Sequence, residues 1–182
     1  RLAPDNPVLR DNLARLQEVN RRPWRLSACL IVRDEEEQVG RCLESLRGVA
    51  DQLVVVDTGS TDRTVEMAAG FGARIGRFAW ADDFAAARNA SLDLADGDWV
   101  VWMDADEYLL PADRLKLARL KGAKPEQAFS FTLVNEGQDR STFRQVKMFP
   151  NRPQVRFERP VHETVLPALQ RQGIPVVMAE VA

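Results

Sequence analysis

The 182-residue sequence contains only one histidine and two cysteines, and its formal net charge is −2. A single histidine argues against a zinc site built from His and Cys ligands. No block of Lys and Arg is present that would give the electrostatic footprint of a nucleic-acid or membrane-surface binder. No apolar run reaches the roughly 18 residues that span a bilayer, and the charged start does not resemble a signal peptide. We therefore predict a cytoplasmic protein with no transmembrane segment and no nucleic-acid partner.

The two cysteines both lie in apolar surroundings. Cys29 is part of an apolar run, and Cys42 occupies an apolar position in a helical pattern. We expect both to be buried, reduced thiols rather than a disulfide or a metal pair. The length and the 45% apolar content predict one main globular domain with a substantial core.

The first 23 residues differ from the rest. The helix start signal Asp5-Asn6-Pro7 precedes apolar residues at helical spacing on one face, namely Leu9, Leu13, Leu16 and Val19. The segment resembles the closing part of a tetratricopeptide repeat, whose helix pairs stack, although an ordinary N-terminal helix docked on the domain explains it equally well. If residues 1–23 are a repeat remnant, we expect them to contact other proteins. Because the chain starts abruptly at Arg1, we expect it to be a piece of a longer protein. From the apolar end at Ala182, we expect residues 24–182 to be a domain truncated at its C-terminus.

From residue 26 onwards, strand and helix patterns alternate. Apolar runs predict strands over residues 27–32, 52–56, 73–78 and from 99, and helical spacing predicts helices over residues 37–46, 64–69 and 84–95. Successive βαβ units give an α/β fold, with a mostly parallel central sheet and helices on both faces. After residue 106 we expect a helix over about 111–120 and added antiparallel strands at 129–133 and 146–148. We place three tryptophans in the core: Trp80, Trp99 and Trp102.

The apolar strand that begins at Trp99 runs directly into Asp104, Asp106 and Glu107. In an open α/β sheet, ligands bind beyond the carboxyl ends of the strands. Strand alternation directs the side chains of Asp104 and Asp106 the same way. They form a pair of hard oxygen ligands suited to Mg²⁺ or Mn²⁺ that carries a phosphate.

Two further polar residues belong to the same predicted edge. Asp57 ends a strand and precedes Gly59 and Ser60, so its carboxylate could accept an N–H of a nucleobase; an Asx turn or a helix cap explains it as well. Arg88 lies in the middle of a helix among alanines. Its planar guanidinium could bind a diphosphate, or it could pair with Asp83 or another nearby acid.

Four segments together, residues 29–36, 54–62, 83–89 and 97–107, resemble the family 2 glycosyltransferases of the GT-A fold. The sequence is most similar to the bacterial branch that is fused to tetratricopeptide repeats. The resemblance covers residues 26–110 well and residues 140–165 more loosely, through Phe149-Pro150-Asn151 and Val161-His162-Glu163. One departure is Asp34, because this branch more often has Asn at that position.

The resemblance implies a nucleoside diphosphate sugar as donor, with a UDP-sugar expected. Asp57 would bind the base, Asp104 the ribose or sugar, and Asp106 the Mg²⁺ or Mn²⁺ on the diphosphate. The implied metal ligands are Asp104, Asp106 and His162. The implied donor-binding residues are Val32, Arg33, Asp34, Glu35, Asp57, Gly59, Ser60, Arg88, Asp104 and Ala105. A cation and Arg88 would stabilise the charge that develops on the leaving diphosphate.

An inverting transfer also needs a base near the acceptor hydroxyl. Glu163 is our first choice and Glu107 the second. His162 would complete the metal coordination or act as the base, or it is an exposed imidazole at a strand end. The acceptor, a glycan, a lipid or a protein, is left open.

Three other functions are weighed against this one. The first is a non-catalytic module that holds a nucleotide sugar or acts as a scaffold for the repeats. A nucleotidyltransferase is disfavoured because residues 33–37 are acidic, where a Gly-rich basic phosphate loop would be needed. A phosphohydrolase with two metal ions would need more acids or histidines.

Overall fold

The computed structural model describes residues 23–135 and 141–181. The predicted helix in residues 1–23 therefore lies outside the described residues, apart from residue 23. The described elements are β1 (Leu26–Val32), α2 (Val39–Leu46), β2 (Gln52–Asp57), α3 (Thr64–Gly70), β3 (Arg74–Arg77), α4 (Phe84–Leu94), β4 (Trp99–Met103), α5 (Pro111–Lys121), β5 (Ala128–Val134), β6 (Thr142–Pro150), α6 (Leu166–Arg171) and β7 (Val176–Met178).

The strands form one sheet in the order β3-β2-β1-β4-β6-β5-β7. The first four pair in parallel, and β6 runs antiparallel to both β4 and β5. The mostly parallel sheet with antiparallel additions is thus confirmed. Val32 pairs with Asp57 and Leu30 with Met103, so the carboxyl ends of β1, β2 and β4 meet at one edge.

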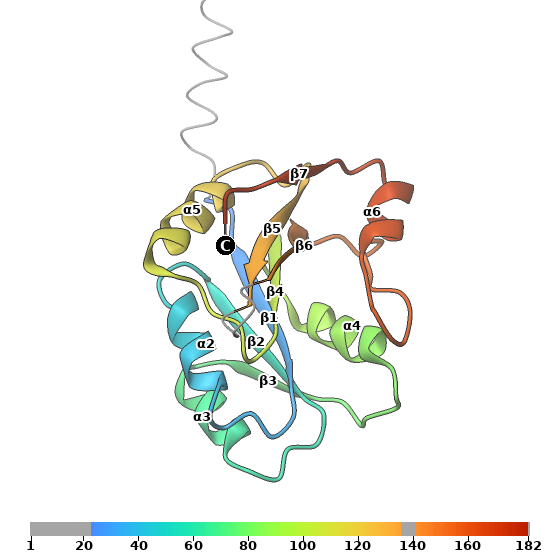
Figure 1. Cartoon of the computed structure of the whole chain (residues 1–182). Coiled ribbons are helices and arrows are strands. Elements are labelled where there is room, and N and C mark those ends of the chain that lie inside the picture. The colour runs from blue at the N-terminus through green and yellow to red at the C-terminus, as the bar shows by residue number, and fades with distance from the viewer. Residues whose placement is uncertain (1–22, 136–140, 182) are drawn as a thin grey trace, which may run out of the picture.

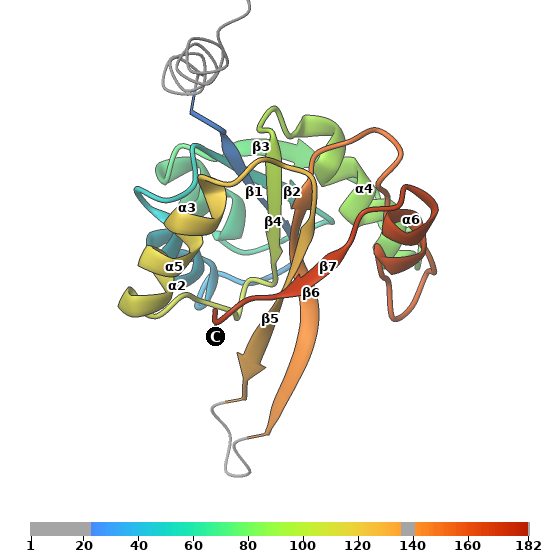
Figure 2. The same cartoon turned by 90° about the horizontal axis from the view of Figure 1, so that it is seen from above.

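Helices cover both faces of the sheet, as predicted. Helices α2, α3 and α5 lie on one face and α4 and α6 on the other, as both views show (Figures 1 and 2). Each face has its own apolar core: one contains Leu43 and Leu117 from the first group of helices, and the other contains Leu92 and Leu169 from the second. The central strands β1, β2 and β4 are largely apolar because both faces of the sheet are buried there. None of the helices in the described part combines the length and the apolar character that a bilayer crossing requires.

The predicted burial of cysteines and tryptophans holds with one exception. Cys29 and Cys42 are buried free thiols, and Trp99 and Trp102 are buried within β4. The prediction was wrong for Trp80, which is only half-buried in the loop between β3 and α4. Its Nε1 donates to Asp82, and its ring packs edge-on against the exposed Phe84, so it lies at the surface.

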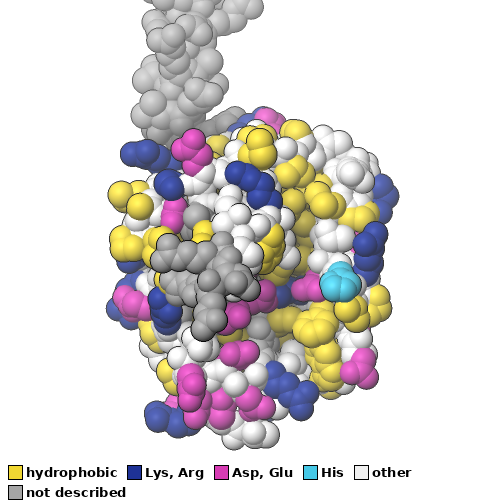
Figure 3. Space-filling view, viewed as in Figure 1, with side chains coloured by type: hydrophobic (Ala, Val, Ile, Leu, Met, Phe, Trp, Pro, Cys, Tyr) yellow, Lys and Arg dark blue, Asp and Glu magenta, His cyan; other side chains and the backbone are white. Residues whose placement is uncertain are grey.

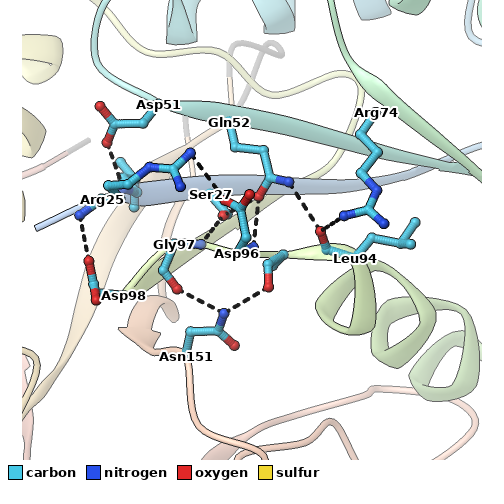
Figure 4. Close-up of polar contacts among 12 residues, drawn as sticks. Arg25, Ser27, Asp51, Gln52, Arg74, Leu94, Asp96, Gly97, Asp98 and Asn151 are labelled. Atoms are coloured by element: carbon cyan, nitrogen blue, oxygen red, sulfur yellow. Dashed lines mark hydrogen bonds and ion pairs between the residues drawn. The ribbon is translucent and has the colours of Figure 1, made fainter.

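Polar contacts fix the amino ends of the strands, opposite the edge at which β1, β2 and β4 end (Figure 4). Asp98 accepts the backbone N–H of Arg25 at 2.8 Å, and Asp51 accepts that of Leu26 at 2.7 Å. The Ser27 hydroxyl accepts the N–H of Gly97 at 2.9 Å. These contacts set where the central strands begin, and hence where their carboxyl ends lie.

Candidate active site

The loops after β1 and β2 are joined by hydrogen bonds at the carboxyl edge of the sheet. Asp34 adopts a left-handed backbone with φ 53°, and its Oδ1 accepts the N–H of Thr61 at 2.7 Å. Its own N–H donates to the Ser60 hydroxyl at 3.0 Å. Asp57 is buried, and its Oδ1 accepts the N–H of Ser60, three residues further on, at 2.9 Å, so part of this carboxylate serves a local contact with the backbone. These hydrogen bonds order the two loops in which the donor-binding residues were predicted. They occupy one carboxylate oxygen of Asp34 and one of Asp57.

Acidic charge accumulates at this edge. The pKa of Glu35 is raised above its ordinary value, first by burial and then by the negative charges of Asp106, Asp104, Asp62 and Asp34. Arg33 is exposed, whereas Val32 and Ala105 are buried. A bound cation would relieve the repulsion between these carboxylates.

Arg88 connects the strand β4 loop with the segment that follows β6. It is buried, with 3% of its side chain exposed, and it forms ion pairs with Asp104 and with Glu163, the latter at 3.2 Å from Nε to Oε1. Its guanidinium also lies 4.3 Å from the centre of the Trp102 ring. Of the two pairings considered from the sequence, Asp83 is not the partner, because Asp83 caps helix α4 by accepting the N–H of Ala86.

The charges around Asp104 shift its titration. Burial acts to raise its pKa, but the positive charges of Arg88 and Lys147 outweigh it, so the pKa lies below the ordinary value. Asp104 is therefore ionised at neutral pH.

The carboxylate of Glu107 is bonded to Lys147 and to the backbone of Asp104. Lys147 donates to both of its carboxylate oxygens at 2.7 and 2.8 Å, and Glu107 Oε2 accepts the N–H of Asp104 at 3.0 Å. Burial raises the pKa of Glu107, and Lys147 opposes this effect. Burial likewise lowers the pKa of Lys147, against the attraction of Glu107. These contacts leave Glu107 poorly placed as a base.

Two cavities meet at Asp104. The larger, of about 730 Å³, is lined by Arg88, His162 and Glu163 among others, and its walls include apolar side chains. The smaller, of about 510 Å³, is lined by Asp106, Glu107 and Lys147 among others. His162 is exposed at φ 56°, and Figure 3 shows it beside acidic side chains and flanked by hydrophobic ones. The structure therefore brings Arg88, Asp104, His162 and Glu163 to one cavity.

The sequence profile described as "Glycosyl transferase family 2" matches residues 27–176 of this chain. The chain belongs to glycosyl transferase family 2. A relative from Synechococcus elongatus, named a TPR repeat-containing protein, is 44% identical over 153 residues, which is 81% of this chain and 38% of the relative. The chain thus spans well under half the length of that relative.

Solved structures confirm the GT-A fold. S. aureus TarS 1–349 superposes with a TM-score of 0.63 at 15% identity, over 86% of this chain and 60% of that one, and shows the fold alone. Glucosyl-3-phosphoglycerate synthase from Mycobacterium tuberculosis, crystallised with Mn²⁺, UDP and phosphoglyceric acid, has a TM-score of 0.50 at 25% identity, over 63% of this chain and 45% of that one.

The predicted metal ligands are Asp104, Asp106 and His162, and their arrangement in the structure shows how well they suit a divalent cation. In residues 23–135 and 141–181, no group of three or more His, Cys, Asp or Glu side chains is gathered into a metal cluster, so Asp104, Asp106 and His162 do not form a preassembled set of three. Asp104 and the exposed Asp106 nevertheless supply hard oxygens in an acidic environment. Because Mg²⁺ is commonly bound by one or two carboxylates together with substrate phosphates, this pair fits an ion that arrives with a nucleotide.

Sequence reasoning missed Lys147, which lies between Glu107 and the Trp102 ring. The available signal was a single lysine within the otherwise apolar run Val146–Pro150. A charged residue flanked by buried strand residues is rarely left without a partner, and that rule would have singled it out.

Proposed function

We propose that this domain transfers a sugar from a UDP-sugar to a nucleophile with inversion, using Mg²⁺ or Mn²⁺. The observation that carries the proposal is the position of Arg88, which joins Asp104 from the β4 loop to Glu163 from the segment after β6 within one cavity. Donor-side and acceptor-side carboxylates are thereby adjacent. The UDP and Mn²⁺ in the complex of the mycobacterial synthase support the choice of donor and ion.

In this proposal the donor lies across the ends of β1, β2 and β4. Asp57, in the ordered turn with Gly59 and Ser60, accepts from the base, and Asp104 contacts the ribose or sugar. Asp104 and Asp106 would hold the divalent ion, which supplies positive charge to the diphosphate. Arg88 adds a fixed positive charge near the same group, and a preorganised charge stabilises the departing diphosphate without reorganisation.

Glu163 is the proposed base. Its side chain is 14% exposed, and the Arg88 ion pair orients it within the cavity. Glu163 takes the proton of the acceptor hydroxyl as the oxygen bonds to the anomeric carbon, and the diphosphate leaves with the electron pair of the broken bond. Glu107 is dropped as the second choice because Lys147 and the Asp104 N–H occupy its oxygens. His162, an exposed residue that lines the cavity, remains a proposed ligand to the ion.

Titration calorimetry tests the donor site directly. UDP and GDP are titrated with and without Mn²⁺ into the wild-type chain, Asp106→Ala, and the control Asp96→Ala, whose carboxylate lies at the opposite edge of the sheet (Figure 4). We expect binding of UDP that depends on Mn²⁺, is lost in Asp106→Ala and persists in Asp96→Ala. Absence of metal-dependent nucleotide binding in the wild type, or equal binding by both variants, contradicts the proposal.

A second measurement tests the base. Glu163→Gln keeps the size of the side chain and removes its capacity to take a proton. If the proposal holds, this variant retains Mn²⁺·UDP affinity and no longer transfers the sugar of a UDP-sugar to water, which serves as the nucleophile in place of the unidentified acceptor. Retained transfer would assign the base to another residue.

A further inference from the structure

Lys147 lies at an irregularity in strand β6. Met148 pairs with Phe129 and Val146 with Ser130 on β5, so Lys147 is the extra residue of a β-bulge. Val146 and Met148 accordingly pack into the cores on opposite faces of the sheet, although alternate residues of a regular strand share a face. A bulge redirects a side chain, and here it permits a buried lysine to reach the loop after β4.

The ammonium of Lys147 is held from two directions. It donates to both oxygens of Glu107 and lies 3.6 Å from the centre of the Trp102 ring, and only 4% of the side chain is exposed. A buried ammonium is costly unless it is paired. The pairing therefore fixes the carboxylate of Glu107 relative to β4 and β6.

Glu107 in turn closes the loop that carries the two aspartates. Its backbone N–H donates to the carbonyl of Asp104 at 3.1 Å, and its carboxylate accepts the N–H of Asp104 at 3.0 Å. Residues 104–107 thus form a turn bonded at both ends. Asp106 lies within this turn, and its side chain is exposed.

We propose that Glu107 and Lys147 are positioning residues that hold this turn so that Asp104 and Asp106 face the metal-bound diphosphate. The inference rests on the proposed function, because it concerns the same site. Neither residue contacts the donor in this account; both act through the backbone of Asp104. An ion pair that served stability alone would leave donor affinity unchanged once the folded state was restored.

The decisive variant is the double substitution Glu107→Gln/Lys147→Met. It removes both charges together, so no unpaired ion stays buried, and it removes the cation that fixes the side chain at position 107 against the Asp104 N–H. Lys147→Arg serves as the conservative variant, because it keeps the positive charge on β6.

The chain provides a matched control at the other edge of the sheet. Lys121 donates to both oxygens of Asp51 at 2.9 Å, and Asp51 also accepts the N–H of Leu26 at the start of β1 (Figure 4). Asp51→Asn/Lys121→Met therefore removes the same chemical arrangement, a lysine on a carboxylate that accepts a strand-end N–H, far from the turn at residues 104–107.

The experiment measures the melting temperature and the calorimetric affinity for UDP with Mn²⁺ for each protein. We expect Glu107→Gln/Lys147→Met to bind about 10- to 100-fold more weakly, as is typical when the partners of metal ligands are lost. The Asp51/Lys121 control should bind as the wild type does, and Lys147→Arg should bind more tightly than the double variant.

Three results would overturn the inference. Wild-type affinity for UDP with Mn²⁺ in a folded Glu107→Gln/Lys147→Met protein would show that the pair serves stability alone. An equal loss of affinity in the Asp51/Lys121 control would show the same. If the double variant does not fold, Glu107→Ala, which removes the acceptor of the Asp104 N–H, is measured instead, and unchanged affinity there has the same meaning. A wild-type chain that binds no UDP with Mn²⁺ would instead remove the proposed function on which the inference rests.

Discussion

Substituting Arg88 by Met should destabilise the fold as well as impair the site. The guanidinium is buried and is the partner of both Asp104 and Glu163. Methionine retains much of the apolar contact with Trp102 but leaves two carboxylates close together without the cation between them. Removing one partner of a buried ion pair is costly because the remaining charge is left desolvated.

The size of the effect follows from the exposure of the partners. Removal of one partner of a fully buried pair costs about 3–5 kcal/mol. Asp104 is 44% exposed and Glu163 14% exposed, so solvent can screen part of the remaining charge. We therefore expect about 3 kcal/mol, at the low end of that range, which for a domain of this size lowers the melting temperature by about 6–12 °C.

Thermal and urea unfolding of Arg88→Met and wild type provide the measurement, with Arg63→Met as the control. Arg63 pairs with Glu66 at the surface, where both side chains are about 70% exposed, so the loss of this ion pair should not change stability measurably.

The contribution of Asp104 to stability should depend on pH. Because the pKa of Asp104 is lowered in the folded state from an ordinary value of 3.8, the stability gained from its ion pair is complete above that pH and is lost as the pH falls below it. Equal stability of Arg88→Met and wild type at neutral pH would refute the reasoning.

Three further predictions concern the scaffold. Burial raises the pKa of Cys29 to about 12 and also raises that of Cys42, so both thiols should react with a disulfide reagent at pH 8 only after unfolding; rapid labelling of the native chain would contradict this. Gly97→Ala should lower the free energy of unfolding by about 1–3 kcal/mol, because the new Cβ would lie 2.7 Å from a backbone nitrogen of β1. A Cβ at Gly70 would have no atom within 4 Å, so Gly70→Ala should be neutral or mildly stabilising in the same urea titration. Asp83→Ala should cost about 1 kcal/mol by removing the N-cap of α4, and unchanged stability would show that its bond to Ala86 is not formed in solution.

The order of strands and helices was predictable because burial on both faces forces parallel strands to be apolar throughout. The runs around Val54–Val56 and Trp99–Met103 have this character, and the turn residues between them were visible as well. Helix α2 was predicted two residues too early, since the backbone over residues 35–38 forms a turn in which Gln38 donates to Glu35. Local pattern alone does not distinguish such a turn from the first turn of a helix.

The partners within the site were less predictable, because they depend on contacts between distant segments. The composition of helix α4 offered Asp83 and other acids equally as partners for Arg88, and only the packing of α4 against the sheet selects Asp104 and Glu163. The bulge that turns Lys147 has no glycine or proline to mark it. Trp80 was misplaced because an isolated aromatic residue in a loop carries no periodicity from which burial can be judged.

The carboxylates at the end of β4 are of two kinds: those held by a buried cation and one that is exposed to solvent. Asp104 and Glu107 are each fixed by a cation, Arg88 or Lys147, and both cations lie against the Trp102 ring. Within the residues that the structure describes, Asp106 has no ion-pair partner and its side chain is exposed. A fixed carboxylate is costly to reorient, whereas an exposed one can exchange water for a ligand at little cost. Ligand exchange at this edge should therefore begin at Asp106, with Asp104 already in place. Consequently, Glu107→Gln/Lys147→Met should mainly accelerate the dissociation of Mn²⁺·UDP in stopped-flow measurements and leave its association, which begins at Asp106, close to the wild-type rate. Slowed association with unchanged dissociation would contradict this division.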